Sequence, residues 1–469
     1  MIRGNDEMRK NPHQRTSPAR DGALRVLIAV DKEGAYANLA LQNIRADLKL
    51  GADDLALLTE LVYGTLRMRG TIDWVIDCFS STPVSKMSHA VRNIVRLGVY
   101  QLLFLDRIPP WAACNEAVEQ AKRWRLAGLA GFVNGLLRSI ARKREEISHP
   151  DPDVDPLSHI SVKYSHPAWL VERWLNRYGK EETIALCRAN NKPAPLVIRC
   201  NTLKITPQEL QQQLERENVI ARFSMLVPEG LVTNLSSLAE LRLFQEGYFA
   251  VQDESSMIAS LVLNPAPGSF VIDACSGPGG KTTHMAQIMQ NRGRILALDV
   301  HSHRLELVAK ACKRMGVSIV EPKLMDVREL PFQLQEKADY ILVDVPCSGL
   351  GVIRRRPDLR WRVKPEDLPQ HARQQLEILK SASRCLAAGG ILVYSTCTTE
   401  PEENTGVIRQ FLEECKDFQP EDLSLRLPFP LVWEEDKVTA RSGFLQLFPH
   451  RHGTDGFFVA CLRKTIKGG

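Results

Sequence analysis

The chain has 469 residues and a formal net charge of +6; 44% of its residues are hydrophobic and 25% are charged. This composition is typical of a globular protein of about three domains and excludes an intrinsically disordered chain. No apolar run of about 18 residues occurs, and the start of the chain is polar and basic, so we expect neither a membrane span nor a secretory signal. The mild positive charge is consistent with an anionic partner.

The 11 cysteines are scattered along the chain, and no C-x-x-C pair occurs. This distribution disfavours a zinc finger or a thioredoxin-like site, and no metal site is predicted. An odd number of cysteines without a signal peptide indicates reduced thiols and a cytoplasmic location. Most of these cysteines are expected to be small apolar core residues.

The N-terminal part of the chain is predicted to be a helical domain. Residues 1–20 are polar and are expected to form a disordered lead-in, whereas residues 21–143 are expected to be helical. Apolar residues recur there at three- and four-residue steps, which predicts a bundle of about five helices. The clearest stretches are 55–79, 89–108, 111–124 and 129–143. Prolines and acidic residues in 144–160 predict a linker.

Two further domains are predicted after the linker. Residues 161–264 combine an aromatic helix (164–179), a strand (195–204), a helix (207–218) and a strand followed by a helix (247–263), which predicts a small α+β module. From 265 to 469 strands alternate with helices, and this predicts an α/β Rossmann-like domain whose parallel sheet is covered on both faces. The segment 443–464 adds two strands that we expect to form a hairpin.

A glycine-rich loop follows the first strand of the α/β domain. The strand SFVIDA ends at Asp273–Ala274 and leads into CSGPGGKTTH (275–284). A P-loop would need glycine at position 275, which is cysteine, and a dinucleotide fingerprint would need glycine at 282, which is threonine. The glycines still allow a tight turn and a close approach of a ligand to the following helix N-terminus.

Acidic residues end the next two strands. Asp299 follows RILAL and can accept both ribose hydroxyls of a nucleoside, and Asp326 can accept a hydrogen bond from an adenine amino group. The alternative for each acid is a helix N-cap. A nucleoside cofactor that lacks a required pyrophosphate fits this pattern, and S-adenosyl-L-methionine is such a cofactor.

Two cysteines lie where open α/β sheets build their active sites. Cys347 in VDVPCSGLG (343–351) and Cys397 in LVYSTCTTE (392–400) each follow a strand and mark its carboxyl end. A thiolate that adds to carbon 6 of a pyrimidine makes carbon 5 nucleophilic, and a base must later remove the carbon-5 proton. Asp344 supplies an acid nearby. The residues alone do not show which thiol attacks, and the alternative for each is apolar core filler.

The surroundings of Cys397 leave the direction of its pKa shift open. Thr398 or Thr399 could cap a following helix, whose amides would lower the pKa of the thiol. The acidic residues Glu400, Glu402 and Glu403 would oppose this effect.

Five arginines occur within nine residues directly after the Pro-Cys segment: Arg354, Arg355, Arg356, Arg360 and Arg362. Arginines at such a place can contact RNA phosphates without reading sequence; the alternative is a solvated basic loop. Trp361 can stack on a base or pack in the core. Arg199 and Asn201 are candidates for further RNA contacts.

Three segments resemble the signature segments of the RNA cytosine-5 methyltransferases: DACSGPGGKTTH, DVPCSGLGVIRRRPDLRW and YSTCTTEPEEN. The resemblance implies that Cys397 is the nucleophile and that Cys347 helps to release the product. It also implies that Lys281 lies near the catalytic Asp344. S-adenosylmethionine would contact Asp299, Asp326, Asp344 and the loop residues Cys275, Ser276, Gly277, Pro278, Gly279, Gly280 and Lys281.

Two N-terminal segments, PWAACNEAVEQAKRW and GFVNGLLRSI, resemble the NusB-like RNA-binding domain. A NusB-like domain (21–143), an RNA-binding α+β module (161–264) and a methyltransferase domain (265–469) are the layout of bacterial enzymes of the RsmB (Fmu/Sun) type. The resemblance implies a cytosine of small-subunit (16S) ribosomal RNA as substrate, and a monomer is expected. Methylation of tRNA and a non-catalytic RNA-binding transcription or assembly factor stay open as alternatives. DNA methylation is disfavoured, because DNA cytosine methyltransferases use the Pro-Cys thiol.

Overall fold

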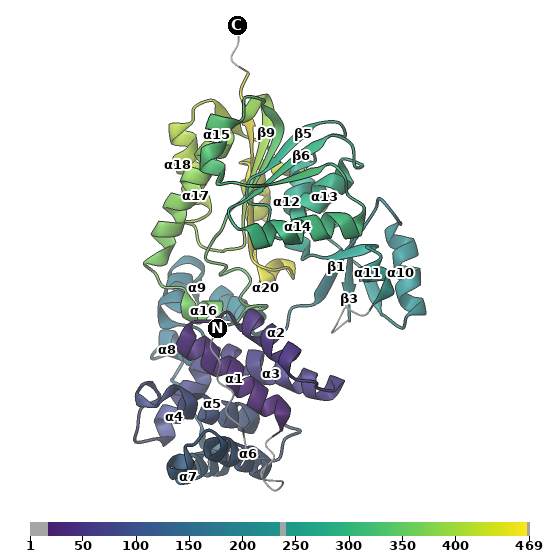
Figure 1. Ribbon diagram of the computed structural model, residues 1–469. Helices are drawn as coiled ribbons and strands as arrows, with labels where there is room; N and C mark the ends of the chain where they lie inside the picture. Colours follow the sequence, from purple (N-terminus) through teal and green to yellow (C-terminus); the bar gives the residue numbers. More distant parts are fainter. Residues whose placement is uncertain (1–16, 235–240, 467–469) are drawn as a thin grey trace. The chain divides into compact units, whose positions relative to one another are not determined.

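The computed structural model describes residues 17–234 and 241–466, which form two compact units (Figure 1). Unit 1 extends to Asn191 and also includes Arg356–Arg362. Unit 2 consists of Lys192–Arg355 and the chain from Val363 onward. Within the described ranges, no helix is both long and apolar enough to cross a membrane.

Unit 1 is an all-helical bundle, as predicted. Helix α5 contacts α1, α3, α4, α6 and α7 and carries an almost continuous run of buried residues from Val91 to Leu102. From residue 17 onward, the helices of the bundle are α1 (Pro18–Glu33), α2 (Ala37–Asp47), α3 (Ala52–Arg67), α4 (Arg69–Phe79), α5 (His89–Phe104), α6 (Pro110–Arg123) and α7 (Ala130–Arg142). Three short 3₁₀ turns join them or follow them: η1 (Val84–Lys86), η2 (Ala127–Leu129) and η3 (Arg144–Glu146).

The boundaries of this unit differ from the predicted ones. The first helix begins at Pro18, inside the predicted lead-in, and residues 1–16 of that lead-in lie outside the described residues. The predicted helix at 55–79 is two helices, because the chain leaves helical geometry at Met68 (φ −96°, ψ 14°). These differences concern the lengths of the helices and not the helical class of the domain.

Two more helices, α8 (Pro156–Lys163) and α9 (Ala168–Asn191), also belong to unit 1 rather than to a linker and an α+β module. The Thr71 hydroxyl of α4 donates to the Val162 carbonyl at 2.6 Å, and the Gly70 amide donates to the Ser165 hydroxyl at 2.9 Å. These contacts join residues about ninety positions apart, which local sequence patterns do not reveal. The helical unit therefore continues well past residue 143.

The α+β module is an antiparallel sheet in the order β2-β3-β1-β4. Its core consists of apolar side chains from the strands and from α10, among them Ile198, Leu210, Leu231 and Phe249. Thr206 and Glu209 form a capping box at the start of α10, which fixes where that helix begins. The elements are β1 (Leu196–Cys200), α10 (Pro207–Arg216), β2 (Ala221–Phe223), β3 (Gly230–Thr233), α11 (Arg242–Gln245) and β4 (Phe249–Val251).

The α/β domain contains an eight-stranded sheet in the order β10-β12-β9-β8-β5-β6-β7, with β11 paired to β12. The five strands from β9 to β7 are parallel, and β12 is antiparallel to β9, β10 and β11. The two strands predicted at the chain end are confirmed as the pair β11 and β12. The strands are β5 (Phe270–Asp273), β6 (Arg294–Asp299), β7 (Val320–Leu324), β8 (Ala338–Asp344), β9 (Leu386–Thr396), β10 (Phe418–Pro420), β11 (Phe444–Leu447) and β12 (Phe457–Lys464).

Helices cover both faces of this sheet, as predicted (Figure 1). One face packs against α12 (Glu254–Leu263), α13 (Gly280–Ile288) and α14 (Ser302–Met315). The other face packs against α15 (Leu330–Gln333), α17 (Asp367–Ser383) and α18 (Thr405–Glu414). In the central strands β5 and β6, neighbouring residues point to opposite faces and nearly all are buried, which is why these strands are mostly apolar. The edge strand β7 is mostly exposed. The remaining short helices are η4 (Val327–Glu329), α16 (Leu359–Arg362), η5 (Leu423–Leu425), α19 (Glu434–Arg441) and α20 (Pro449–His452).

Helix α12 was predicted to be part of the α+β module. In the structure it packs against β8, β9, β12 and α13, so it belongs to the α/β domain. Its mostly apolar sequence is buried on this sheet.

Candidate active site

The two thiols meet at the carboxyl edge of the central strands. Strands β8 and β9 are paired so that Asp344 lies opposite Ser395. Cys347 follows β8 and Cys397 follows β9, and their sulfur atoms are 3.3 Å apart. The strand pairing therefore brings together the two cysteines that the sequence left as a separated pair.

A lysine–aspartate pair lies in the same place. The Lys281 ammonium, from the first turn of α13, donates to Asp344 Oδ2 at 2.7 Å, and the Ser395 hydroxyl donates to Asp344 Oδ1 at 2.8 Å. The ammonium also lies 5.3 Å from the centre of the Phe457 ring. The predicted neighbours Lys281 and Asp344 are thus in direct contact. Ser395 was missed, although it lies near the end of β9, two residues before Cys397.

The two thiols are not equivalent. The hydrogen bond from Cys347 lowers the pKa of the Cys397 thiol, and the Lys281 ammonium acts in the same direction against burial and the nearby carboxylates. The same hydrogen bond and burial raise the pKa of Cys347. Cys397 is therefore the thiol that ionises first. The helix suggested to start at Thr398 or Thr399 begins at Thr405 instead, so helix amides do not cause this shift.

Glu403, which sequence reasoning took only as an acid opposing ionisation, is a buried acceptor between the two cysteine segments. Its carboxylate accepts from the Ser348 amide at 2.8 Å, from the Ser348 hydroxyl and from the Gln375 amide at 2.9 Å. The adjacent Asn404 accepts from Thr396 Oγ1 at 2.6 Å and donates to the Thr398 carbonyl at 3.0 Å. Ser348 adjoins Cys347, and Thr396 and Thr398 flank Cys397.

The Glu403 carboxylate is expected to position the thiols. In Glu403→Gln, the new amide NH₂ would face the donors of Ser348 and Gln375, which now bind the carboxylate. Two donors repel each other, so the segment after Cys347 should shift. We expect kcat for methyl transfer to fall about 10- to 100-fold, because small misplacements of reacting groups cost this much. The affinity for S-adenosylhomocysteine, measured by calorimetry, should be unchanged. Glu413→Gln, exposed on α18, is the control; equal kcat in both variants would contradict the role.

The glycine loop and Asp299 form one wall of a cavity. The Gly277 amide donates to Asp299 Oδ2 at 3.1 Å, and the His301 amide donates to Asp299 Oδ1 at 2.9 Å. A Cβ atom at position 277 would lie 2.5 Å from Asp299 Oδ2, and Gly279 has a φ of +100°, so both positions require glycine. The cavity has a volume of about 520 Å³, and Cys275, Gly277, Asp299, Asp326 and Asp344 are among its lining residues.

Asp326 caps the N-terminus of η4, which is the alternative to an adenine contact that the sequence left open. Its side chain accepts from the Arg328 amide at 2.9 Å at the start of η4. The Arg328 guanidinium lies 2.6 Å from Asp326 Oδ2 and lowers the pKa of that carboxyl. The carboxylate still lines the cavity, so capping and ligand contact are compatible here.

A smaller cavity of about 180 Å³ adjoins the first and shares Cys275, Gly277 and Asp344 with it. Ser276, Pro278, Gly280 and Lys281 also line it, together with Asp273. The Thr282 hydroxyl donates to Asp273 Oδ2 at 2.7 Å, while Oδ1 is buried and has no hydrogen-bond donor among the described residues. Burial raises the pKa of Asp273 to about 7.

Arg199 and Asn201, predicted to contact RNA, are buried inside unit 2. The Arg199 guanidinium donates to the Gly280 carbonyl at 2.6 Å and to Thr283 Oγ1 at 2.9 Å. Asn201 donates to the carbonyls of Gly247 and Met315, each at 2.8 Å. Both side chains therefore support the fold, Arg199 directly beneath the first turn of α13, and neither is placed to meet RNA.

Most of the arginines after the Pro-Cys segment are also used inside the protein. Arg354 and Arg355 form ion pairs with Asp455 and Asp253 in unit 2. In unit 1, Arg360 is fully buried and donates to the Ser165 carbonyl at 2.9 Å, and Arg362 donates to the Ala35 carbonyl at 3.0 Å. Arg356 is the exposed one of the five.

Trp361 also has a structural role in unit 1. Its indole N–H donates to the Leu66 carbonyl at 2.9 Å, and the Arg69 guanidinium lies 5.4 Å from its ring. Trp361 therefore packs within unit 1, which is the alternative to stacking on an RNA base.

Comparison with known proteins agrees with this arrangement. The family profile described as 16S rRNA methyltransferase RsmB/F matches residues 260–463. The NusB family profile matches 17–142, and the ferredoxin-like domain of RsmF/B-like methyltransferases matches 166–236. The three matches follow the order in which the helical bundle, the α+β module and the α/β domain occur in the chain.

The individual relatives and solved structures cover from 64% to 95% of this chain. The probable ribosomal RNA small subunit methyltransferase B of Bacillus subtilis is 40% identical over 95% of this chain and 98% of its own length. The crystal structure of PH0851 has a TM-score of 0.79 at 31% identity and covers 95% of this chain and 99% of its own. NSun6 from Pyrococcus horikoshii, solved with SFG, has a TM-score of 0.58 at 29% identity and covers 64% of this chain and 99% of its own. The chain thus belongs to the RsmB/F family of 16S rRNA methyltransferases, which use S-adenosylmethionine.

Proposed function

We propose that this protein transfers the methyl group of S-adenosyl-L-methionine to carbon 5 of one cytosine in 16S ribosomal RNA, through a covalent adduct with Cys397. The observation that carries the proposal is the pair of thiols 3.3 Å apart at the carboxyl edge of the sheet, beside the Lys281–Asp344 pair. The name of the Bacillus subtilis relative supports the choice of small-subunit ribosomal RNA. We further propose that it acts as a monomer in the cytoplasm.

The chemistry assigns a separate task to each side chain. The Cys397 thiolate adds to carbon 6 of the cytosine, and the resulting enamine makes carbon 5 nucleophilic. The Asp344 carboxyl would hydrogen-bond the ring at nitrogen 3, and Lys281, which donates to that carboxyl, would hold it in place. After carbon 5 has accepted the methyl group, Cys347 takes part in removing the carbon-5 proton. Loss of this proton restores the double bond and expels the Cys397 sulfur.

The two adjoining cavities fit S-adenosylmethionine. The Asp299 carboxylate, at the end of β6, would accept the ribose hydroxyls, and Asp326 would lie near the adenine. The unpartnered Oδ1 of Asp273 in the smaller cavity is suited to a donor such as the amino group of the methionine part. The cofactor supplies a methyl group on a sulfonium. Cys275, Gly277 and Asp344 line both cavities, so they would lie between the nucleoside part and the methionine part of the cofactor.

Asp299→Ala is expected to weaken cofactor binding specifically. Loss of charge-assisted hydrogen bonds to the ribose should raise the Kd for S-adenosylhomocysteine about 10- to 100-fold, measured by calorimetry. Transfer at saturating cofactor should recover most of the wild-type rate. Glu306→Ala, exposed on α14, is the matched control. An unchanged Kd in Asp299→Ala would rule out the ribose contact.

The activity itself is tested with RNA. The full chain is incubated with S-adenosylmethionine and with total RNA from a strain that lacks the protein, and bisulfite sequencing then locates the new 5-methylcytosine. We expect one site in 16S rRNA and none in tRNA. Methylation of tRNA alone would overturn the ribosomal assignment, and no methylation of either would favour an RNA-binding factor.

A further inference from the structure

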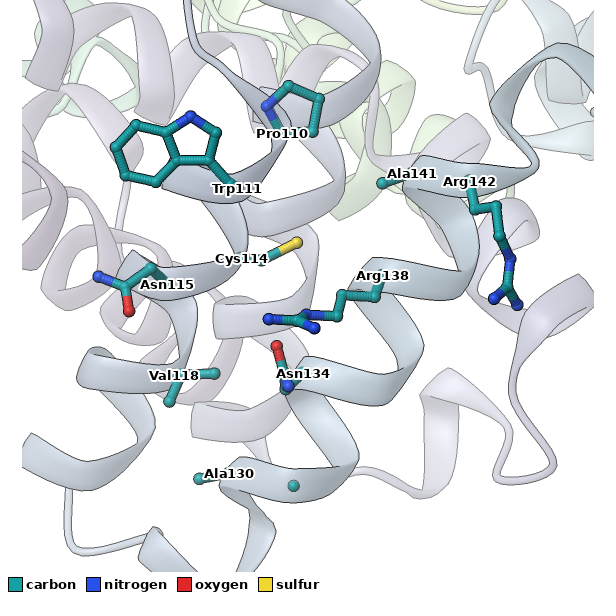
Figure 2. Close-up of a pocket in the computed structure, with 11 residues that line it drawn as sticks. Pro110, Trp111, Cys114, Asn115, Val118, Ala130, Asn134, Arg138, Ala141 and Arg142 are labelled. Carbon is teal, nitrogen blue, oxygen red and sulfur yellow. The ribbon is translucent and has the colours of Figure 1, made fainter.

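The smaller cavity of the candidate active site is lined from two domains of unit 2. On the side opposite to the glycine loop its lining includes Gln252, which directly follows β4 of the α+β module, and Ser256, in the first turn of α12. A Cβ atom at position 280 would lie 3.8 Å from the amide carbon of Gln252, so this amide lies against the loop. The larger cavity between α6 and α7, in contrast, is lined by unit 1 alone (Figure 2).

Arg199 of β1 fixes the direction of the Gln252 amide. The fully buried Arg199 guanidinium donates to Gln252 Oε1 and to the Gly280 carbonyl, the latter at 2.6 Å. Burial lowers the pKa of Arg199 to about 9, which leaves the group charged at neutral pH. A guanidinium has donors only, so the amide oxygen of Gln252 must face Arg199 and its NH₂ group must face the other way.

The Gln252 amide and the Ser256 hydroxyl present free donors to the cavity. Gln252 Nε2 donates to Ser256 Oγ at 3.2 Å, which uses one of its two hydrogens. Within the described ranges the Ser256 hydroxyl accepts this bond and donates to no other group. Asp273 Oδ1, in the same cavity, is an acceptor without a donor. Donors on one side and a carboxylate on the other are complementary to an α-amino acid group, which carries both a carboxylate and an ammonium.

We propose that Gln252 and Ser256 bind the carboxylate of the methionine part of S-adenosylmethionine, and that Arg199 is a positioning residue that aims the Gln252 amide at this carboxylate. The inference rests on the proposed function, which places the methionine part in the smaller cavity with its amino group at Asp273. It extends the cofactor site into the α+β module. It also makes the site selective for a nucleoside that carries an amino-acid end.

Two ligands separate this contact from a general effect on the fold. S-adenosylhomocysteine has the amino-acid end, whereas 5′-methylthioadenosine keeps the nucleoside and the thioether but lacks it. The Kd of each ligand for the full chain is measured by calorimetry, and wild type should bind S-adenosylhomocysteine more tightly. Gln252→Ala should raise the Kd for S-adenosylhomocysteine about 10- to 100-fold, the effect of losing a hydrogen bond to a charged group. The Kd for 5′-methylthioadenosine should stay unchanged.

The positioning role is tested with Arg199→Lys. An ammonium keeps the charge but cannot hold Gln252 and the Gly280 carbonyl together in a planar fork. The Kd for S-adenosylhomocysteine should rise about 2- to 10-fold, and that for 5′-methylthioadenosine should not change. Gln287→Ala is the matched control. Gln287 also accepts from Arg199, at 2.9 Å, and is 5% exposed as Gln252 is, but it lines neither cavity, so both ligands should bind as they do to wild type.

Three results would overturn the inference. These are an unchanged Kd for S-adenosylhomocysteine in Gln252→Ala, an equal rise for both ligands, or the same selective loss in Gln287→Ala. Binding of 5′-methylthioadenosine shows that a variant is folded, and Gln252→Ala decides the carboxylate contact even when Arg199→Lys does not fold. Methylation of 16S rRNA by wild type is measured in parallel. Transfer together with an unselective Gln252→Ala refutes the carboxylate contact alone, whereas absent transfer together with a selective loss refutes the proposed reaction and not the contact.

Discussion

Cys397→Ala is expected to abolish methyl transfer while cofactor binding is retained. The Cys397 sulfur is the atom that forms the bond to carbon 6, and without it carbon 5 of the cytosine is too weak a nucleophile. Loss of a covalent nucleophile reduces kcat by roughly 10⁴-fold or more. The rate is followed as transfer of tritium-labelled methyl to 16S rRNA, and the Kd for S-adenosylhomocysteine is measured by calorimetry.

The control for this prediction is Cys415→Ala, which removes a partly exposed thiol just after α18, outside the site. It should transfer methyl groups as wild type does. Retained turnover in Cys397→Ala would show that another group attacks, with Cys347 as the first candidate because its sulfur is only 3.3 Å away. A large loss of cofactor affinity would instead indicate damage to the cavity.

The strand ends could be predicted because their signal is local. Each catalytic or cofactor-binding segment is an apolar run followed by glycine, proline or an acid, and parallel strands bring such ends to one edge. Asp344, Cys347 and Cys397 were found in this way. The ranking of the two thiols, in contrast, came from family resemblance. The structure adds a physical reason for it, since the hydrogen bond between the two thiols and the charge of Lys281 lower the pKa of Cys397.

Charge patterns were the weakest guide. The run of arginines from Arg354 to Arg362 suggested a surface for RNA, yet Asp253 and Asp455, about a hundred residues away on either side, pair with two of them. Arg360 packs into the helical unit. These partners are distant in sequence, so spacing alone cannot show that the charges are already neutralised or buried. The role of Glu403 was missed for the same reason, because Ser348 and Gln375 are brought to it only by the fold.

Cys347→Ala is expected to trap the covalent protein–RNA adduct. If Cys347 takes part in removing the carbon-5 proton, the methylated cytosine stays bonded to Cys397 when the Cys347 thiol is absent. Adduct should accumulate with S-adenosylmethionine present and should migrate as a slow band on a denaturing gel. The double variant Cys347→Ala with Cys397→Ala is the control and should give no band, because the bond is made by Cys397.

Cys347 can also act by lowering the pKa of Cys397. This role predicts a different dependence of the rate on pH from a role in product release. The hydrogen bond between the two thiols lowers the pKa of Cys397, so loss of Cys347 should raise that pKa and reduce the thiolate fraction of Cys397 at neutral pH. If this were its only role, Cys347→Ala would turn over slowly without adduct, and raising the pH through the new pKa would restore the rate. If Cys347 acts in release, raising the pH speeds adduct formation but not turnover. A variant that is rescued at high pH and shows no slow band at any pH would therefore remove Cys347 from the release step.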